Sequence, residues 1–145
     1  MNKTRCLIRF LVLTFGLLGS WCSAKAQDVV LVANKGVQIS DITDADLRAI
    51  FMGTKTRFAD GSHAVPVTLK GGPVHEVFLR NHVGESPEEF RAQWRKEVFT
   101  GQGAMPKAFN SESALLDYVA VTPGAVGYVS RMSSQEGVKS LGTVK

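Results

Sequence analysis

"VTLKGGPVHEVF", residues 67–78, runs from a short apolar segment through Lys70 and two glycines into a segment that begins with Pro73. Its β-branched start is typical of a strand, and proline is typical of the first position of a helix. A strand that turns directly into a helix presents backbone N–H groups and the positive end of the helix dipole to the space beyond the turn. The stretch therefore predicts a strand, a turn and a helix, with a candidate anion-binding site at the turn.

Strand and helix patterns alternate along the rest of the chain. The predicted strands cover 28–34, 64–69, 124–130 and 138–144, and the predicted helices lie within 42–53, 73–83, 86–99 and 111–121. Strands separated by helices favour parallel pairing through crossover connections. We therefore predict an α/β fold, a single three-layer lobe with a short, mostly parallel sheet flanked by helices. In such sheets ligands bind beyond the carboxyl ends of the strands, where the 70–75 turn falls.

Capping residues mark the helix starts. Thr43 and Ser86 are typical N-caps, and Glu89 completes a capping box with Ser86. The helix within 86–99 is predicted to pack on the core through a stripe that runs from Phe90 to Val98. Aromatic residues at helical spacing or at helix ends are predicted to lie in the core, namely Phe90, Trp94, Phe99 and Tyr118.

Residues 1–26 carry the pattern of a secretory signal peptide. Basic residues precede an apolar run, and small residues stand at Ala24 and Ala26. We therefore expect a cleavable signal peptide at 1–26, a single domain at 27–145 and a periplasmic location.

Removal of this signal changes which functions the composition allows. The whole chain has a formal net charge of +4, from 17 basic and 13 acidic residues. The signal carries four of the basic residues and no acidic one, so the mature domain is close to neutral and no nucleic-acid partner is expected. It also carries both cysteines, and lipidation of Cys22 is disfavoured because Trp21 precedes it. No later segment is apolar enough to cross a bilayer, so no membrane partner is expected after cleavage.

The sequence holds no signature of catalysis or of metal binding. His75 and His82 lie on one predicted helix but about 10.5 Å apart along its axis, which is too far to share one ion. We expect both histidines on an exposed rim beside Phe78 and Leu79. The serines and acids occur in no nucleophile motif such as G-x-S-x-G, and capping and turns explain them. We therefore expect a non-catalytic protein with no metal and no cofactor.

The glycine turn remains the candidate site. Backbone N–H groups on both sides of Pro73 would donate to an anion, and Lys70 would add a positive charge. Pro73 itself lacks an N–H and removes one donor. The simpler alternative is a tight turn whose glycines only supply positive φ angles. A second edge of the site is expected at 100–103. The candidate anion-binding residues are Lys70, Gly71, Gly72, Val74, His75, Thr100, Gly101 and Gly103.

Several motifs together carry a resemblance to a known family. They are DITDADLRAIFMGTKTRFADG at 41–61, FLRNHVG at 78–84, QWRKEVFTGQG at 93–103 and TPGAVGYVS at 122–130. In this order they resemble the phosphate-binding substrate-binding proteins of bacterial ABC transporters, which have the type 2 periplasmic-binding-protein fold. The resemblance runs from Val29 to about Arg131 and implies that 27–145 is one periplasmic-binding-protein-like lobe of the two that full members have.

The resemblance implies where a ligand binds and how well. Family members hold phosphate partly through an Arg and a Ser-Gly-Thr type loop, at the turn where this chain has LKGGPV. Here Lys70 stands for the positive charge, and a single lobe leaves one side of the anion in water. We expect an exported substrate-binding-like protein, related to ABC-type phosphate uptake, that binds phosphate or a similar small oxyanion weakly. The alternative is a periplasmic interaction module, for self-association or a protein partner, with a vestigial ligand site.

Overall fold

The structure is a computed structural model that describes residues 28–131 and 133–144. These ranges contain six strands, four α-helices and one π-helix. Their bounds are β1 (Val29–Ala33), β2 (Asp41–Thr43), α1 (Asp44–Phe51), β3 (Val65–Leu69), α2 (Pro73–Phe78), the π-helix η1 (Leu79–Val83), α3 (Pro87–Phe99), β4 (Lys107–Phe109), α4 (Glu112–Val121), β5 (Ala125–Ser130) and β6 (Lys139–Val144).

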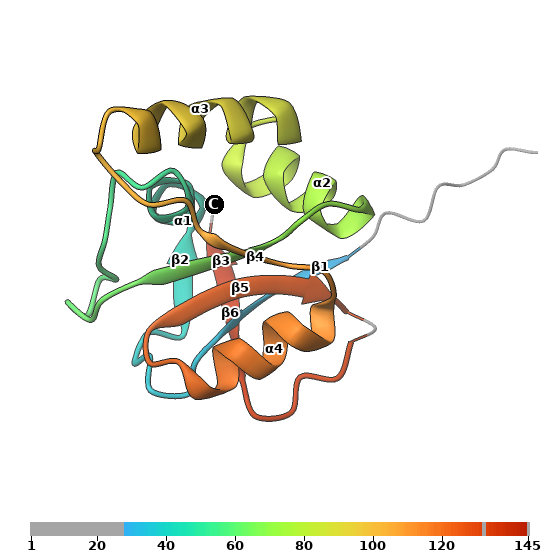
Figure 1. Ribbon diagram of the computed structural model, residues 1–145. Coiled ribbons are helices and arrows are strands. Elements are labelled where there is room, and N and C mark those ends of the chain that lie inside the picture. The colour runs from blue at the N-terminus through green and yellow to red at the C-terminus, as the bar shows by residue number, and fades with distance from the viewer. Residues whose placement is uncertain (1–27, 132, 145) are drawn as a thin grey trace, which may run out of the picture.

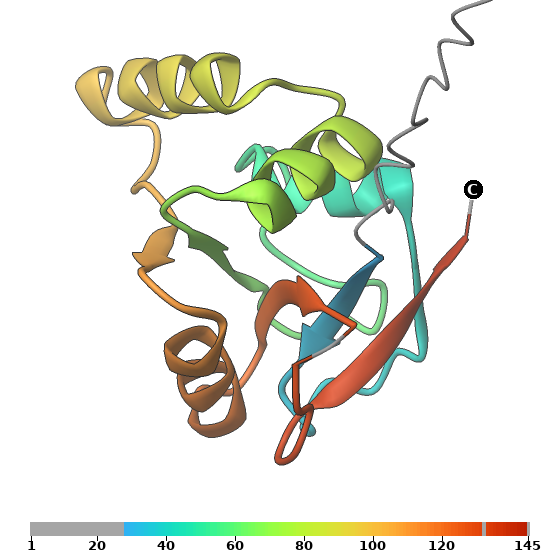
Figure 2. The same ribbon diagram turned by 90° about the vertical axis from the view of Figure 1, so that its right-hand side faces the viewer.

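The six strands form one mixed sheet in the order β2-β6-β1-β5-β3-β4. β3 runs parallel to β4 and β5, and β2 runs parallel to β6, whereas β1 lies between β5 and β6 and runs antiparallel to both. α1, α2 and α3 lie on one face of the sheet and α4 on the other (Figure 1), and the view turned by 90° shows the same layers (Figure 2). The predicted three-layer α/β lobe is confirmed, and three of the five strand pairs are parallel, while the two that involve β1 are antiparallel.

The N-caps of α1 and α3 form as the sequence predicts. Thr43 accepts a hydrogen bond from the N–H of Asp46 at 3.1 Å, and Ser86 and Glu89 form the capping box. The segment 73–83, predicted as one helix, changes from an α-helix to a π-helix at Leu79 and ends at Gly84 in the left-handed conformation. Within the described residues, no helix combines the length and the apolar character that crossing a bilayer requires.

Aromatic side chains fill the core between the sheet and α1–α3. The rings of Phe78 and Tyr128 stack with centroids 3.7 Å apart, and Phe51 meets Phe78 edge-on at 4.8 Å. Phe90 and Trp94 are buried as predicted, but the prediction for Phe99 is wrong because its side chain is 92% exposed. The apolar stripe of α3 loses contact with the core in the last turn, since Val98 is also exposed.

Candidate functional site

Three parallel strands end at the same edge of the lobe. β3 is parallel to both β4 and β5, so all three strands end at the same edge of the sheet. Their last residues are Leu69, Phe109 and Ser130. α2 begins after β3 and α4 begins after β4, so two helix N-termini meet there. A pocket of about 190 Å³ lies at this edge, and its lining residues are Leu69, Gly71, Gly72, Pro73, Val74, Asn110, Ser111 and Glu112.

The glycine turn forms one wall of this pocket. Gly72 has a φ of 96°, which favours glycine, and it is the N-cap of α2. The N–H of Lys70 donates to the carbonyl of Phe109 at 2.9 Å and fixes the turn to the end of β4. Among the described residues, no acceptor takes the N–H groups of Gly71, Gly72 or Val74. These three N–H groups are therefore available to a ligand in the pocket.

A carboxylate stands on the opposite wall. Glu112, in the first turn of α4, accepts hydrogen bonds from the N–H and the hydroxyl of Ser130, both at 2.9 Å, and from the hydroxyl of Ser133. Burial raises the pKa of Glu112, but the hydrogen bonds from Ser133 and Ser130 lower it by more, so its pKa lies below the ordinary value. The pocket edge therefore carries a negative charge at neutral pH, which opposes the binding of an anion.

The side chain of His75 is not part of the pocket. It is buried, and its Nδ1 lies 2.5 Å from the hydroxyl of Tyr128. The prediction of an exposed rim is therefore wrong for His75, because the α2 helix turns this ring toward β5. His82 is bonded separately to Asp44 at 2.9 Å. Within the described residues, no three His, Cys, Asp or Glu side chains come close enough together to hold a metal ion.

The other predicted residues lie outside the pocket. The side chain of Lys70 is exposed and does not line the pocket, although it is adjacent to it in the chain. Thr100, Gly101 and Gly103 follow α3, whose C-terminal end lies on the opposite side of the molecule from the 70–73 turn (Figure 1). The hydroxyl of Thr100 donates instead to carbonyl groups within α3. The predicted second edge of the site, at 100–103, therefore does not line this pocket.

Three residues of the opposite wall were not predicted as site residues. Asn110 and Glu112 gave no sequence signal for ligand binding, and Ser111 was explained by helix capping. The hydroxyl of Ser111 does cap α4 by accepting from the N–H of Ala114 at 3.2 Å. The N-cap of α4 is the one signal in the sequence that could have identified this wall. It marks a second helix start after a parallel strand, and such helix starts lie at the same edge of the sheet.

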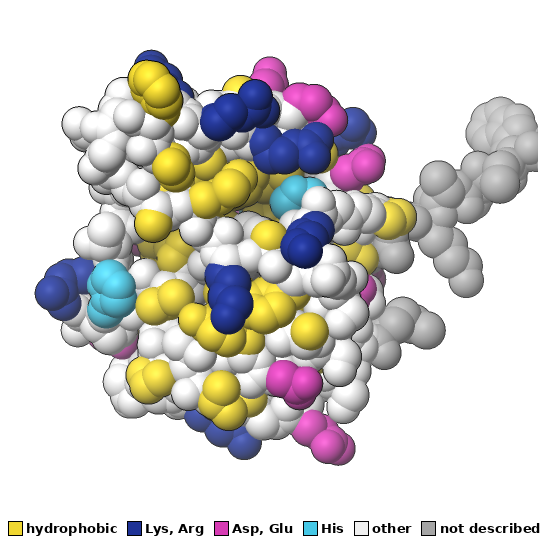
Figure 3. All heavy atoms as spheres, viewed as in Figure 1, with side chains coloured by type: hydrophobic (Ala, Val, Ile, Leu, Met, Phe, Trp, Pro, Cys, Tyr) yellow, Lys and Arg dark blue, Asp and Glu magenta, His cyan; other side chains and the backbone are white. Residues whose placement is uncertain are grey.

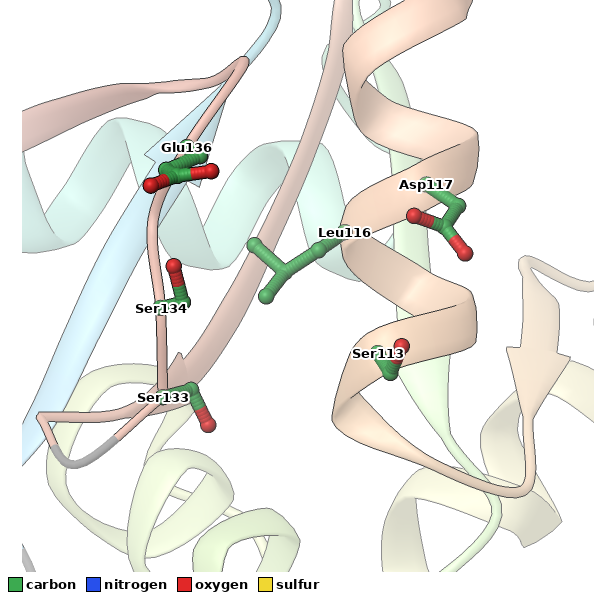
Figure 4. A pocket seen from close by; sticks show the side chains of 6 residues that line it. All are labelled: Ser113, Leu116, Asp117, Ser133, Ser134 and Glu136. Carbon is green, nitrogen blue, oxygen red and sulfur yellow. The ribbon is translucent and has the colours of Figure 1, made fainter.

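A larger hollow lies on the α4 side of the sheet. It has a volume of about 310 Å³, and its lining residues are Ser113, Leu116, Asp117, Ser133, Ser134 and Glu136. Leu116 points from α4 toward the segment 133–136, which carries Glu136 on the other side (Figure 4). Of the described residues that line this hollow, two are carboxylates and none is basic, so it does not suit an anion. The smaller pocket at the glycine turn is the better oxyanion candidate.

The structure is an α/β lobe with a pocket at the carboxyl ends of three parallel strands. No protein-family model matches the sequence. Among solved structures, the chain is similar to an ABC-type phosphate transport receptor from Vibrio cholerae, with 19% identity over 79% of this chain and 45% of that one and a TM-score of 0.53. It is also similar to PstS from Borrelia burgdorferi, with 16% identity over 79% and 46% and a TM-score of 0.58.

A phosphate-bound structure from Clostridium perfringens gives a similar match. Its identity to this chain is 18% over 79% of this chain and 44% of that one, with a TM-score of 0.56. This chain thus spans less than half the length of each of these three structures. At these identities the likeness establishes the fold, which is that of part of the phosphate ABC transporter substrate-binding proteins.

Proposed function

We propose that this chain is an exported, non-catalytic binding protein that takes phosphate or a similar small oxyanion, in connection with ABC-type phosphate uptake. The observation that carries the proposal is the pocket at the glycine turn, where three N–H groups without an acceptor among the described residues meet the start of α2. The likeness to phosphate receptors supports the same ligand class, because the pocket lies where α/β folds hold their ligands.

The proposed donors are the N–H groups of Gly71, Gly72, Val74 and His75, and the exposed side chain of Lys70, which precedes the turn in the chain, would add a positive charge. We propose weak binding for three reasons. Pro73 contributes no N–H, the carboxylate of Glu112 repels an anion, and the pocket is open to solvent on one side, which screens the electrostatic attraction.

The amide resonances of the turn test this function directly. Titration of the purified protein with inorganic phosphate or sulfate, followed by ¹⁵N–¹H NMR, is expected to shift the amide signals of Gly71, Gly72, Val74 and His75 at millimolar ligand. Lys70→Ala should weaken binding about two- to fivefold, as expected for an exposed charge, whereas Lys35→Ala in a different loop should not. Absence of any shift at these four amides in millimolar phosphate would contradict the proposal.

Export is a separate part of the proposal. Residues 1–26 lie outside the described residues, and their pattern is the support for a cleavable signal peptide. Expression in a bacterium, followed by intact-mass measurement of the periplasmic fraction, should find a chain that begins near Gln27. A chain of full mass in the cytoplasmic fraction would contradict export without affecting the ligand proposal.

A further inference from the structure

One face of α3 is exposed along the whole helix. Glu88, Ala92, Lys96 and Phe99 follow one another at helical spacing on this face, and all four side chains are exposed. We call these four residues the α3 stripe. A shallow hollow of about 330 Å³ runs along it, and its lining residues are Ala92, Arg95, Lys96 and Phe99. Figure 3 shows exposed hydrophobic side chains beside Lys and Arg side chains over the α3 layer.

The last turn of α3 exposes apolar surface that a partner could cover. Phe99 is 92% exposed and Val98 is 50% exposed, and Met105 in the following loop is 49% exposed. Nearly all of the apolar surface of this phenylalanine is in contact with water, so its burial against another surface would be favourable. A single helix offers only a small contact area, so the expected complex is weak and dissociates readily.

The α3 stripe carries an acidic residue, Glu88, toward its start and a basic residue, Lys96, toward its end. Glu88 lies in the first turn of α3, and Arg95 and Lys96 lie near the end of the helix. Within the described residues, no carboxylate lies at salt-bridge distance from Arg95 or Lys96. Glu88 forms an ion pair with Arg91 of its own helix, at 3.2 Å, and both side chains are more than half exposed. Such exposed pairs contribute little, so Glu88 is able to accept another cation.

This arrangement makes the α3 stripe complementary to itself. When two copies of α3 lie antiparallel about a two-fold axis at Ala92, residues four positions before and four positions after Ala92 face one another. Glu88 of each copy then faces Lys96 of the other. Ala92 at the centre has a small side chain that allows the helices to approach closely. Phe99 of each copy then lies opposite residue 85 of the other, just before the start of the opposite helix.

We propose that the α3 stripe is the docking surface for a second copy of this chain, which packs its own α3 antiparallel to the first. The hollow along the α3 stripe and the pocket at the glycine turn share no lining residue, so the proposed interface is separate from that pocket. Association through the α3 stripe therefore does not require phosphate.

Charge reversal provides the decisive experiment. The mass of the purified protein is measured by light scattering and sedimentation from micromolar to millimolar concentration, without phosphate and at low and high salt. Glu88→Lys and Lys96→Glu should each weaken association at least about fivefold, because each places like charges opposite one another twice. An equimolar mixture of the two variants should associate as well as the unmodified protein, and so should the double variant. High salt should weaken association of the unmodified protein.

The apolar part has its own matched pair of variants. Phe99→Ser should weaken association about tenfold or more, whereas Val121→Ser, which removes a 78% exposed apolar side chain from α4, should leave it unchanged. Circular dichroism verifies that each variant is folded. A protein that stays monomeric at millimolar concentration would overturn the proposal, and so would a mixture of the charge variants that fails to associate. Binding of a monomer to vesicles of anionic phospholipid would instead assign this face to a membrane surface.

Discussion

The hydroxyl of Tyr128 lies 2.5 Å from Nδ1 of His75 and also accepts the N–H of Leu69 at 3.1 Å. Burial raises the pKa of Tyr128, so this hydroxyl keeps its proton and donates it to His75. Burial also lowers the pKa of His75, the charge of Arg91 lowers it further, and Glu76 raises it in part. The imidazole of His75 is therefore neutral in the folded protein, with Nδ1 as the acceptor.

Protonation of His75 should make stability depend on pH. An unfolded chain binds this proton near pH 6.5, but the folded chain binds it only at lower pH because the pKa of His75 is lowered. The free energy of unfolding should therefore fall as the pH drops below about 6.5, by at most about 1.4 kcal/mol per pH unit for this group, and should level off below the folded pKa. Urea unfolding between about pH 8 and pH 5 measures this.

The control for this pH dependence is a second histidine. His75→Gln should flatten the profile in that range, whereas His63→Gln, at an exposed position, should not. A profile that keeps its slope below about pH 6.5 in His75→Gln would assign the pH dependence to another group.

Removal of the Tyr128 hydroxyl should destabilise the protein. Tyr128→Phe leaves the buried N–H of Leu69 and Nδ1 of His75 without this partner, at an expected cost of about 1–3 kcal/mol in the free energy of unfolding. Tyr118→Phe is the matched control, since Tyr118 is only half-buried and packs against Phe109 through its ring. Equal unfolding midpoints for the two variants would show that the buried hydrogen bonds contribute nothing.

Local signals predicted local structure well. The caps at Thr43, Ser86 and Ser111 form as expected because a cap depends on residues within one turn of the helix. The periodicity of α3 predicted which side of the helix is apolar, and Phe90 is buried on that side. It did not predict where the core beneath the helix ends, and so Phe99 was wrongly assigned to the core.

Long-range contacts explain what the sequence did not predict. β4 has only three residues, none of them buried, and it exists as a strand through its pairing with β3, so the predicted strands do not include it. Without β4 the wall formed by Asn110 and Glu112 could not be placed beside the glycine turn. The burial of His75 likewise depends on Tyr128, which lies 53 residues away in the chain. The pattern around His75 holds no information on that distant partner.

Gly53 should tolerate no side chain. It has a φ of 78°, and a Cβ there would lie 2.6 Å from Cη2 of Trp94, whose ring is buried and whose Nε1–H donates to the carbonyl of Phe51. Gly53→Ala should therefore cost about 2–4 kcal/mol of stability, from backbone strain and overpacking together. Gly61→Ala separates the two effects, because Gly61 has a similar φ of 84° and no atom within 4 Å of the added Cβ. Equal costs for both variants would argue against the contact with Trp94.

Pro73 should limit the affinity of the proposed oxyanion site. Pro73→Ala adds an N–H at the first position of α2, on the wall of the pocket, and should raise phosphate affinity about three- to tenfold. Pro87→Ala is the matched control, since Pro87 opens α3 in the same way but lies outside the pocket. NMR titration with phosphate measures both variants. An unchanged dissociation constant for Pro73→Ala would mean that the bound anion does not face the start of α2.

Glu112 should weaken anion binding through its charge. Its carboxylate is kept ionised by the hydrogen bonds from Ser133 and Ser130, and it stands on the wall opposite the glycine turn. Glu112→Gln keeps an acceptor for these donors but removes the charge, so phosphate affinity should rise about two- to fivefold at low salt and less at high salt. Asp117→Asn removes a charge from the same helix outside this pocket and should have a smaller effect. A lower phosphate affinity in Glu112→Gln would contradict repulsion, because it would mean that the carboxylate accepts a hydrogen bond from the ligand.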